Sequence, residues 1–142
     1  MTTYSVTRNV SARPEVIWDL LTDAASYPDW NPAVLRIEGE ITEGERIALT
    51  SVVNPDRKFK LTVTQFDPPS KMVWADGMPL GLFKGVRTYT VEPSPDGTTE
   101  FRMVEVFSGL MEPLISKSIP DMTESFEMFG DAVKRAAEER GA

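Results

Sequence analysis

The stretch that decides the fold runs from Pro14 to Pro32 and reads PEVIWDLLTDAASYPDWNP. Four of its apolar residues recur three and four positions apart and so share one helical face: Val16, Ile17, Leu20 and Leu21. We therefore expect a helix over Pro14–Thr22, which is too short to be stable alone in water and must pack against other elements. The aromatic, proline-punctuated turn after it has room for a single helical turn at most, at Asp29–Asn31.

Strand patterns lie on both sides of this helix. Tyr4–Val10 alternates in the manner of a half-buried strand. Six further strand patterns follow the helix with turn residues between them: Val34–Glu40, Arg46–Val53, Lys58–Phe66, Lys71–Asp76, Leu82–Glu92 and Thr98–Ser108. The connections between these six are too short to hold crossover helices, so the sequence predicts an antiparallel meander.

From Leu110 onward the apolar period becomes helical. A continuous apolar stripe contains Met122, Phe126, Phe129, Val133 and Ala136 or Ala137. Pro120 separates an expected first turn or two at Met111–Lys117 from a main helix that begins near Asp121. Gly130 lies within the stripe, where it weakens the helix but permits the close approach of a neighbour.

Composition excludes several classes of function. The chain of 142 residues has the length of a single domain, 1–142, and its net charge of −7 argues against nucleic acid or an anionic membrane as a partner. It has no cysteine and no histidine, which excludes disulfides, thiolate chemistry, Ser-His-Asp catalysis and typical zinc sites. No apolar run approaches the roughly 20 residues that span a bilayer, and the first residues lack a signal region. We expect a cytoplasmic monomer or homodimer, without metal or cofactor.

Four segments carry a resemblance to a known superfamily: Ala12–Asp23 (ARPEVIWDLLTD), Tyr27–Pro32 (YPDWNP), Phe83–Gly85 (FKG) and Glu105–Leu110 (EVFSGL). With them the chain resembles the START-like, or SRPBCC, superfamily, and within it the polyketide cyclase/dehydrase-like branch. The resemblance implies an α+β helix-grip (START-like) fold, in which a curved antiparallel sheet of about six to seven strands wraps around the long C-terminal helix. A short helix follows the first strand. The resemblance also implies a deep, mostly apolar cavity for small hydrophobic molecules between sheet and helix.

Strand parity places two charged side chains on the aromatic-rich face, which we expect to be concave. If the turn at Pro93–Gly97 closes a hairpin, Tyr89 lies opposite Met103 and Arg87 lies opposite Glu105. An unpaired charge in an apolar cavity is costly, so this placement requires Arg87 and Glu105 to pair. The pair either orients a polar group of a ligand or is purely structural.

The same parity and the apolar helical stripe together give a set of candidate cavity-lining residues, each of which has packing of the core as its alternative role. These ligand-binding candidates are Trp74, Phe83, Arg87, Tyr89, Phe101, Met103, Glu105, Phe107, Met122, Phe126 and Phe129. Flexible methionine side chains suit a pocket that adapts to apolar ligands, and they equally suit gaps in a core.

Three functions remain open. The first is the binding of a small hydrophobic, aromatic or lipid-like molecule, which needs only an apolar cavity with a few polar groups. The second is a polyketide cyclase or dehydratase-like enzyme, with Arg87 as electrophile and Glu105 or Asp76 as base. Pairing with an arginine favours the charged carboxylate, which weakens the case for Glu105. The third is a protein-interaction or co-chaperone-like module. No catalytic residue is assigned.

Overall fold

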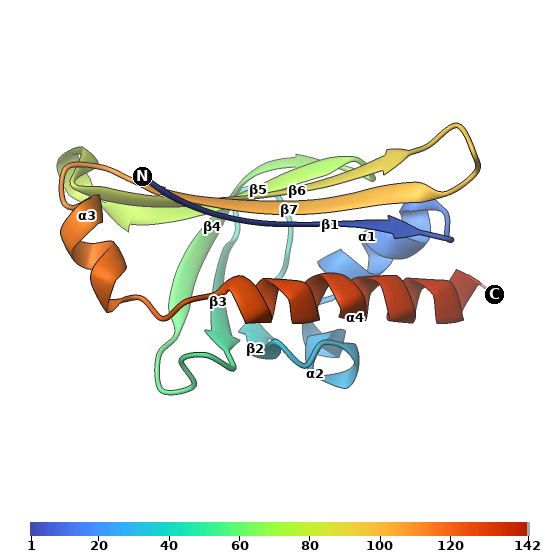
Figure 1. The fold of residues 1–142 in the computed structure, drawn as a ribbon, viewed down its shortest axis with the longest axis horizontal. Coiled ribbons are helices and arrows are strands. Elements are labelled where there is room, and N and C mark those ends of the chain that lie inside the picture. The colour runs from blue at the N-terminus through green and yellow to red at the C-terminus, as the bar shows by residue number, and fades with distance from the viewer. Residues whose placement is uncertain (142) are drawn as a thin grey trace.

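The computed structural model describes residues 1–141, which form one seven-stranded sheet with helices against one face (Figure 1). The strands are β1 (Thr2–Val10), β2 (Val34–Glu38), β3 (Arg46–Ser51), β4 (Phe59–Asp67), β5 (Lys71–Met78), β6 (Phe83–Pro93) and β7 (Thr99–Ser108). The α-helices are α1 (Pro14–Thr22), α2 (Tyr27–Trp30), α3 (Glu112–Ile115) and α4 (Thr123–Gly141). Short 3-10 turns are η1 (Ala24–Ser26), η2 (Pro79–Gly81) and η3 (Ser116–Ser118). No helix within 1–141 is both long and apolar enough to cross a membrane.

The sheet has the order β1-β7-β6-β5-β4-β3-β2, and all neighbouring strands are antiparallel. The predicted meander from β2 to β7 is therefore confirmed, and β1 joins it at the free edge of β7. Irregular register in β2 and β4 marks β-bulges, which increase local twist and bend a strand. The sheet curls toward the helices, and the long α4 runs along its concave face, as expected (Figure 1).

The first helix has the expected bounds, but the turn after it differs from the prediction. Its α-helical turn is α2, which begins at Tyr27 rather than Asp29, and η1 precedes it. Tyr27 is fully buried, and its hydroxyl donates a hydrogen bond of 2.6 Å to the Leu21 carbonyl. Its ring lies 4.9 Å from that of Trp30. Its ring also lies 6.2 Å from that of Phe129 in α4, a contact between distant segments that local sequence signals do not contain.

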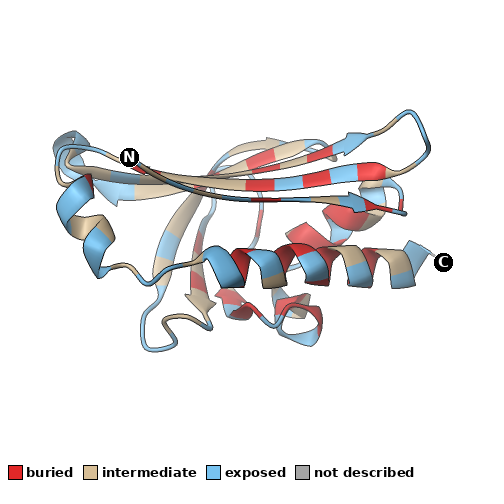
Figure 2. Cartoon of the chain, in the orientation of Figure 1, coloured by how far each residue is buried: buried red, intermediate tan, exposed pale blue. Residues whose placement is uncertain are grey.

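The core lies between the concave face and α4, toward the end of the sheet where α1 packs. Buried positions gather on that half of the sheet and on the side of α4 that faces it, whereas the opposite end is more exposed (Figure 2). Most of the predicted helical stripe is buried there: Phe126, Phe129, Val133, Ala136 and Ala137. Met122, at the beginning of the stripe, is only partly buried.

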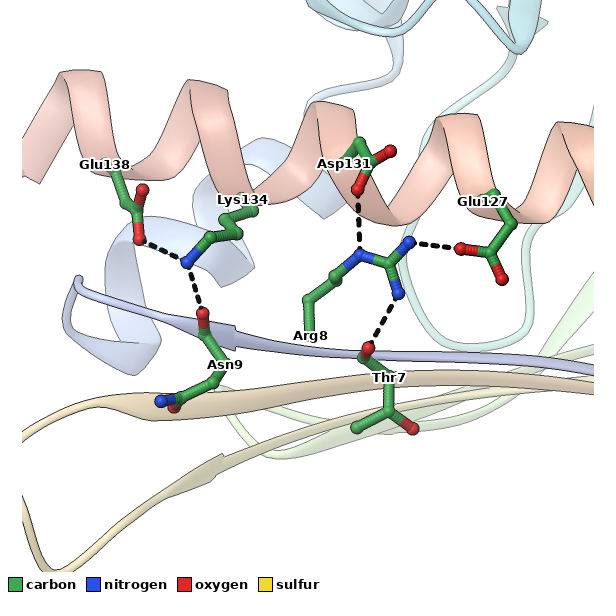
Figure 3. A network of polar contacts seen from close by, with 7 residues as sticks. All are labelled: Thr7, Arg8, Asn9, Glu127, Asp131, Lys134 and Glu138. Atoms are coloured by element: carbon green, nitrogen blue, oxygen red, sulfur yellow. Dashed lines mark hydrogen bonds and ion pairs between the residues drawn. The ribbon is translucent and has the colours of Figure 1, made fainter.

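Polar contacts fasten β1 to α4 along the rim of this core (Figure 3). Arg8 donates a hydrogen bond of 2.9 Å from Nε to Asp131 and a second from Nη2 to Glu127. Lys134 donates from Nζ to the Asn9 carbonyl at 2.6 Å. Such exposed pairs add little stability individually. Together they hold the helix side by side with the strand.

Gly130 is the place where α4 comes closest to β1. A Cβ atom at this position would lie 2.6 Å from Cγ2 of Val6 and 3.2 Å from Cγ of Arg8. The first distance is far shorter than a carbon–carbon contact, and Val6 is a buried, β-branched residue that cannot move aside easily. The expected close approach at Gly130 is therefore present.

Gly130→Ala is expected to destabilise the protein by about 1 kcal/mol, although alanine is the better helix former. The gain in helix propensity is about 1 kcal/mol, and overpacking against a rigid neighbour costs about 1–3 kcal/mol. In a Val6→Ala background, which removes the clashing methyl groups, the same substitution should become stabilising. Urea unfolding of the two single variants and the double variant measures this coupling. A stabilising Gly130→Ala in both backgrounds would show that the close approach does not matter.

Candidate functional site

A row of four side chains crosses the concave face at the boundary between its buried and partly exposed ends. Trp74 on β5 pairs with Arg87 on β6, Arg87 pairs with Glu105 on β7, and Glu105 pairs with Tyr4 on β1. Phe126 of α4 lies against this row, with its ring centroid 5.2 Å from Cζ of Arg87 and 5.7 Å from the Tyr4 ring. The predicted register of β6 with β7 is confirmed.

The ion pair at the centre of the row is largely removed from water. Nε of Arg87 donates to Oε1 of Glu105 at 2.6 Å, and the two side chains are only 11% and 12% exposed. Nη1 of Arg87 also donates to the Tyr89 hydroxyl at 3.5 Å. The pairing that strand parity required is thus present, and it leaves the centre of the concave face without net charge.

Burial and the ion pair together fix which groups of the row carry protons. Burial alone would lower the pKa of Arg87, but the charge of Glu105 and the Tyr89 hydroxyl outweigh it, so this pKa lies above its ordinary value. Burial raises the pKa of Tyr89 to about 12, although the charge of Arg87 partly offsets that rise. At neutral pH the guanidinium is therefore charged and the phenol keeps its proton.

On one side of the row the interior is tightly packed. Phe129 of α4 lies 6.0 Å from the Tyr89 ring and stacks at 6.3 Å on Phe101. Trp74 lies 4.7 Å from Tyr89, and all four side chains are at most 2% exposed. Contact of this kind gives a rigid core.

On the other side of the row, apolar side chains of the concave face remain partly open to solvent. Phe83 stacks on Phe107 with ring centroids 5.6 Å apart, and Phe83 is only partly buried. Leu61 on β4 and Met122 before α4 are partly buried as well. A Cβ atom at Gly85 would lie 3.2 Å from the Phe107 ring, so the ring, which is buried, packs directly over Gly85. We call this region the open end of the concave face.

All eleven candidate residues lie near the interface between the sheet and α4. Most are on the concave face of the sheet, Phe126 and Phe129 are on the side of α4 that faces it, and Met122 comes just before α4. The buried ones are Trp74, Tyr89, Phe101, Met103, Phe107, Phe126 and Phe129. The partly exposed ones are Phe83, Arg87, Glu105 and Met122. Their contact with a ligand stays a prediction.

Two hollows of about 460 Å³ each lie on the outer surface, and none of these candidates lines either of them. One is lined by charged side chains of α4, and the other lies between the β1–α1 turn, the β6–β7 hairpin and the end of α4. Within residues 1–141 no three acidic side chains converge in the way that metal ligands would.

Tyr4 is a member of the row that sequence reasoning missed. Its ring lies 6.4 Å from Phe107 in an edge-on arrangement and also touches Phe126. Tyr4 has the same strand parity as the buried Val6 and Val10, and this parity could have placed it on the concave face. Its place beside Glu105 depends on the pairing of β1 with β7, which no local pattern specifies.

Comparisons with known proteins agree with this architecture. The family model described as "Polyketide cyclase / dehydrase and lipid transport" matches residues 1–138. A crystallised Mesorhizobium loti protein is 20% identical with a TM-score of 0.73, over 97% of this chain and 98% of its own. A START superfamily protein from Mycobacterium smegmatis is 17% identical with a TM-score of 0.70, over 97% and 98%.

A third similar structure has two domains. The di-domain ARO/CYC protein BexL from the BE-7585A biosynthetic pathway is 16% identical with a TM-score of 0.71, over 97% of this chain and 47% of BexL. No curated protein matches the sequence significantly. These structural likenesses establish the START-like fold. The family model matches nearly the whole length of the chain and therefore also shows its family. The chain belongs to the polyketide cyclase / dehydrase and lipid transport family.

Proposed function

We propose that this protein binds a small, mostly apolar molecule at the open end of the concave face. The observation that carries the proposal is apolar surface left partly uncovered beside a nearly buried ion pair. Phe83, Leu61 and Met122 are each only partly buried, so apolar surface of all three retains solvent contact. An apolar ligand would remove that surface from water, which is the dominant gain in such binding.

The family description and one similar structure support this choice of ligand class. The family is described by polyketide chemistry and lipid transport, and both concern molecules with large apolar parts. BexL is an ARO/CYC protein of a biosynthetic pathway, and its fold resembles the one here. At this low identity the resemblance supports a shared scaffold, and the proposed ligand class is argued from the residues of the open end.

The ion pairs made by the carboxylates favour binding over catalysis. A general base must be free to accept a proton near neutral pH. Glu105 is held by Arg87 at 2.6 Å, and the carboxylate of Asp76 lies 3.4 Å from Nη2 of Arg46. Tyr89 keeps its own proton because its pKa is about 12. The enzyme and protein-interaction roles considered from the sequence stay predictions.

The proposal is tested by native mass spectrometry of the purified protein with organic extraction, followed by thermal-shift titration with a panel of apolar aromatic molecules. We expect a co-purifying molecule or a saturable shift with part of the panel. Gly85→Leu should weaken that binding about tenfold or more, because even its Cβ would lie 3.2 Å from the Phe107 ring and the larger side chain must displace that ring toward the open end.

Val86→Leu is the matched control, because it adds bulk at the next residue on the opposite face of β6. It should leave binding unchanged. Equal loss in both variants would point to a general effect of bulk in β6. The absence of any bound molecule or saturable shift would contradict the proposed function.

A further inference from the structure

Two neighbouring loops at the end of the sheet opposite α1 expose leucine side chains that the core does not use. Leu80 in η2 is 92% exposed, Leu110 after β7 is 82% exposed and Leu114 in α3 is 66% exposed. The amide of Leu110 donates a hydrogen bond of 3.3 Å to the Gly81 carbonyl, so the two loops lie together (Figure 1). We call η2 and the segment 109–118 the leucine tip.

The backbone at Leu80 adopts a conformation that costs energy. Its φ of 63° lies in the left-handed region, which glycine enters freely and leucine enters rarely. The side chain is almost fully exposed, so packing within the chain does not offset this cost. A backbone outlier of this kind is a reason to look for a contact with another molecule.

Helix α3 has the reverse of the usual polarity, because it buries a carboxylate and exposes a leucine. Glu112 is 3% exposed, whereas Leu114 is turned to solvent. Glu112 accepts hydrogen bonds from the hydroxyls of Thr2 and Ser116, and its Oε2 lies 3.0 Å from the amino group of Met1. A surface helix normally does the opposite, because burial favours apolar groups and disfavours charged ones. These polar contacts hold α3 in the orientation that keeps its leucine in solvent.

The inward turn of Glu112 also sets the charge of the tip surface. Glu112 is the single acidic residue in 77–86 and 108–120, and the exposed charged residues of these two segments are Lys84 and Lys117. The tip is therefore apolar and positive, although the whole chain carries a net charge of −7. Charges farther than about 10 Å from a surface are largely screened at 0.1 M salt, so a surface that touches the tip is attracted by the lysines.

Leucines on protruding turns with lysines beside them fit a lipid surface better than a second protein. A stable protein interface engages about 20–30 residues on each side, whereas the tip offers three exposed leucines from two narrow loops. A second copy of the tip would also bring the lysines of both copies together. A bilayer deforms around single side chains, buries them near the acyl chains and presents phosphate groups to lysines at the depth of the headgroups.

We propose that the leucine tip docks this protein reversibly on lipid bilayers that contain anionic headgroups. Leu80, Leu110 and Leu114 insert toward the acyl chains, and Lys84 and Lys117 meet the phosphates. The negative charge of the rest of the chain keeps its other faces away from the bilayer. The argument from net charge against an anionic membrane therefore holds for the chain as a whole and not for its tip. This inference goes beyond the proposed function and does not depend on it.

Flotation with vesicles tests the proposal, with phosphatidylcholine alone and with three parts of phosphatidylcholine to one of phosphatidylglycerol. We expect binding to the mixture, weaker binding to phosphatidylcholine, and loss of this difference at high salt. The double variant Leu80→Ser, Leu110→Ser should weaken binding at least tenfold, because each leucine would bury most of its side chain. Leu35→Ser is the matched control, because Leu35 is 46% exposed on β2, an edge strand that is distant from β6 in the sheet order.

The charge of the tip is tested separately. Lys84→Gln, Lys117→Gln should remove most of the preference for phosphatidylglycerol and leave binding to phosphatidylcholine nearly unchanged. Lys71→Gln makes the same change of charge at the opposite end of β5 from Met78, and it should keep most of the preference.

Insertion itself is measured with a nitroxide label. The chain has no cysteine, so Leu114→Cys takes the label at one position only. On vesicles this label should become accessible to oxygen and protected from a water-soluble nickel complex. A label at Leu35→Cys should stay accessible to nickel.

Failure of the parent protein to bind either kind of vesicle would overturn the proposal, and so would equal binding by the parent protein and the double leucine variant. A dimer that the leucine substitutions dissociate, without binding to vesicles, would also overturn it, because the tip would then bind a second copy. The leucine variants should keep the thermal shift with apolar molecules. Loss of docking alone therefore leaves the proposed function standing.

Discussion

Arg87→Met is expected to lower the free energy of unfolding by about 3 kcal/mol or more, one of the largest losses from a single substitution at the site. Removal of the guanidinium leaves the Glu105 carboxylate, which is only 12% exposed, without its partner at 2.6 Å. Breaking a buried pair in this way lowers the free energy of unfolding by far more than the intact pair contributes to it, because an uncompensated charge remains. The contact of Arg87 with the Phe126 ring is lost as well. Urea unfolding at neutral pH measures the loss.

The double variant Arg87→Met, Glu105→Leu distinguishes this cause from lost packing. It removes both charges and keeps similar side-chain volumes, so it should recover most of the stability that the single variant loses. Arg46→Met is the comparison at an exposed pair, where Arg46 and Asp76 are 52% and 40% exposed, and it should cost less than about 1 kcal/mol. A double variant as unstable as Arg87→Met would mean that packing, and not charge, sets the effect.

Phe129→Ala is expected to cost about 3–5 kcal/mol, the usual range for the loss of a buried phenylalanine. Its ring is 2% exposed and touches the sheet through Phe101 and Tyr89, and it touches α2 through Tyr27 and Trp30. The substitution therefore opens a cavity where three elements meet. Thermal and urea unfolding should show the loss, with a smaller effect for Phe129→Leu.

Leu114→Ala is the control for Phe129→Ala, because Leu114 is 66% exposed in α3. It should change stability by no more than about 0.5 kcal/mol. A loss at Phe129 no larger than at Leu114 would mean that the packed side of the row is fluid in solution. That result would also remove the distinction between the packed interior and the open end.

Local sequence signals predicted most of the sheet and the ion pair because their causes are local. The turn at Pro93–Gly97 sets the register of β6 against β7, and that register alone places Arg87 opposite Glu105. The apolar period of α4 likewise shows which of its faces is buried. The cost of an unpaired charge then makes the pairing of Arg87 with Glu105 predictable from the sequence alone.

The features that local sequence signals did not predict depend on contacts between distant segments. Tyr4 joins the row only because β1 pairs with β7, and the ring of the buried Tyr27 lies 6.2 Å from that of Phe129 in α4. The indole N–H of Trp74 has no hydrogen-bond partner within residues 1–141, which only the three-dimensional arrangement shows. Residue type and strand parity indicate which face a side chain occupies, whereas its partners depend on how the whole sheet curls.

The pairing of β1 with β7 also has a consequence for the order of events during synthesis. Thr2 pairs with Phe107 and Val10 with Thr99, so β1 leaves the ribosome first among the strands and has no partner until β7 has been made. Contacts this distant along the chain are slow to form, because a long loop must close before they gain any energy. An unpaired strand of alternating pattern readily pairs with other chains. The interval between translation of β1 and of β7 is therefore when a nascent chain is most exposed to aggregation, and a chaperone that binds the nascent chain would act then.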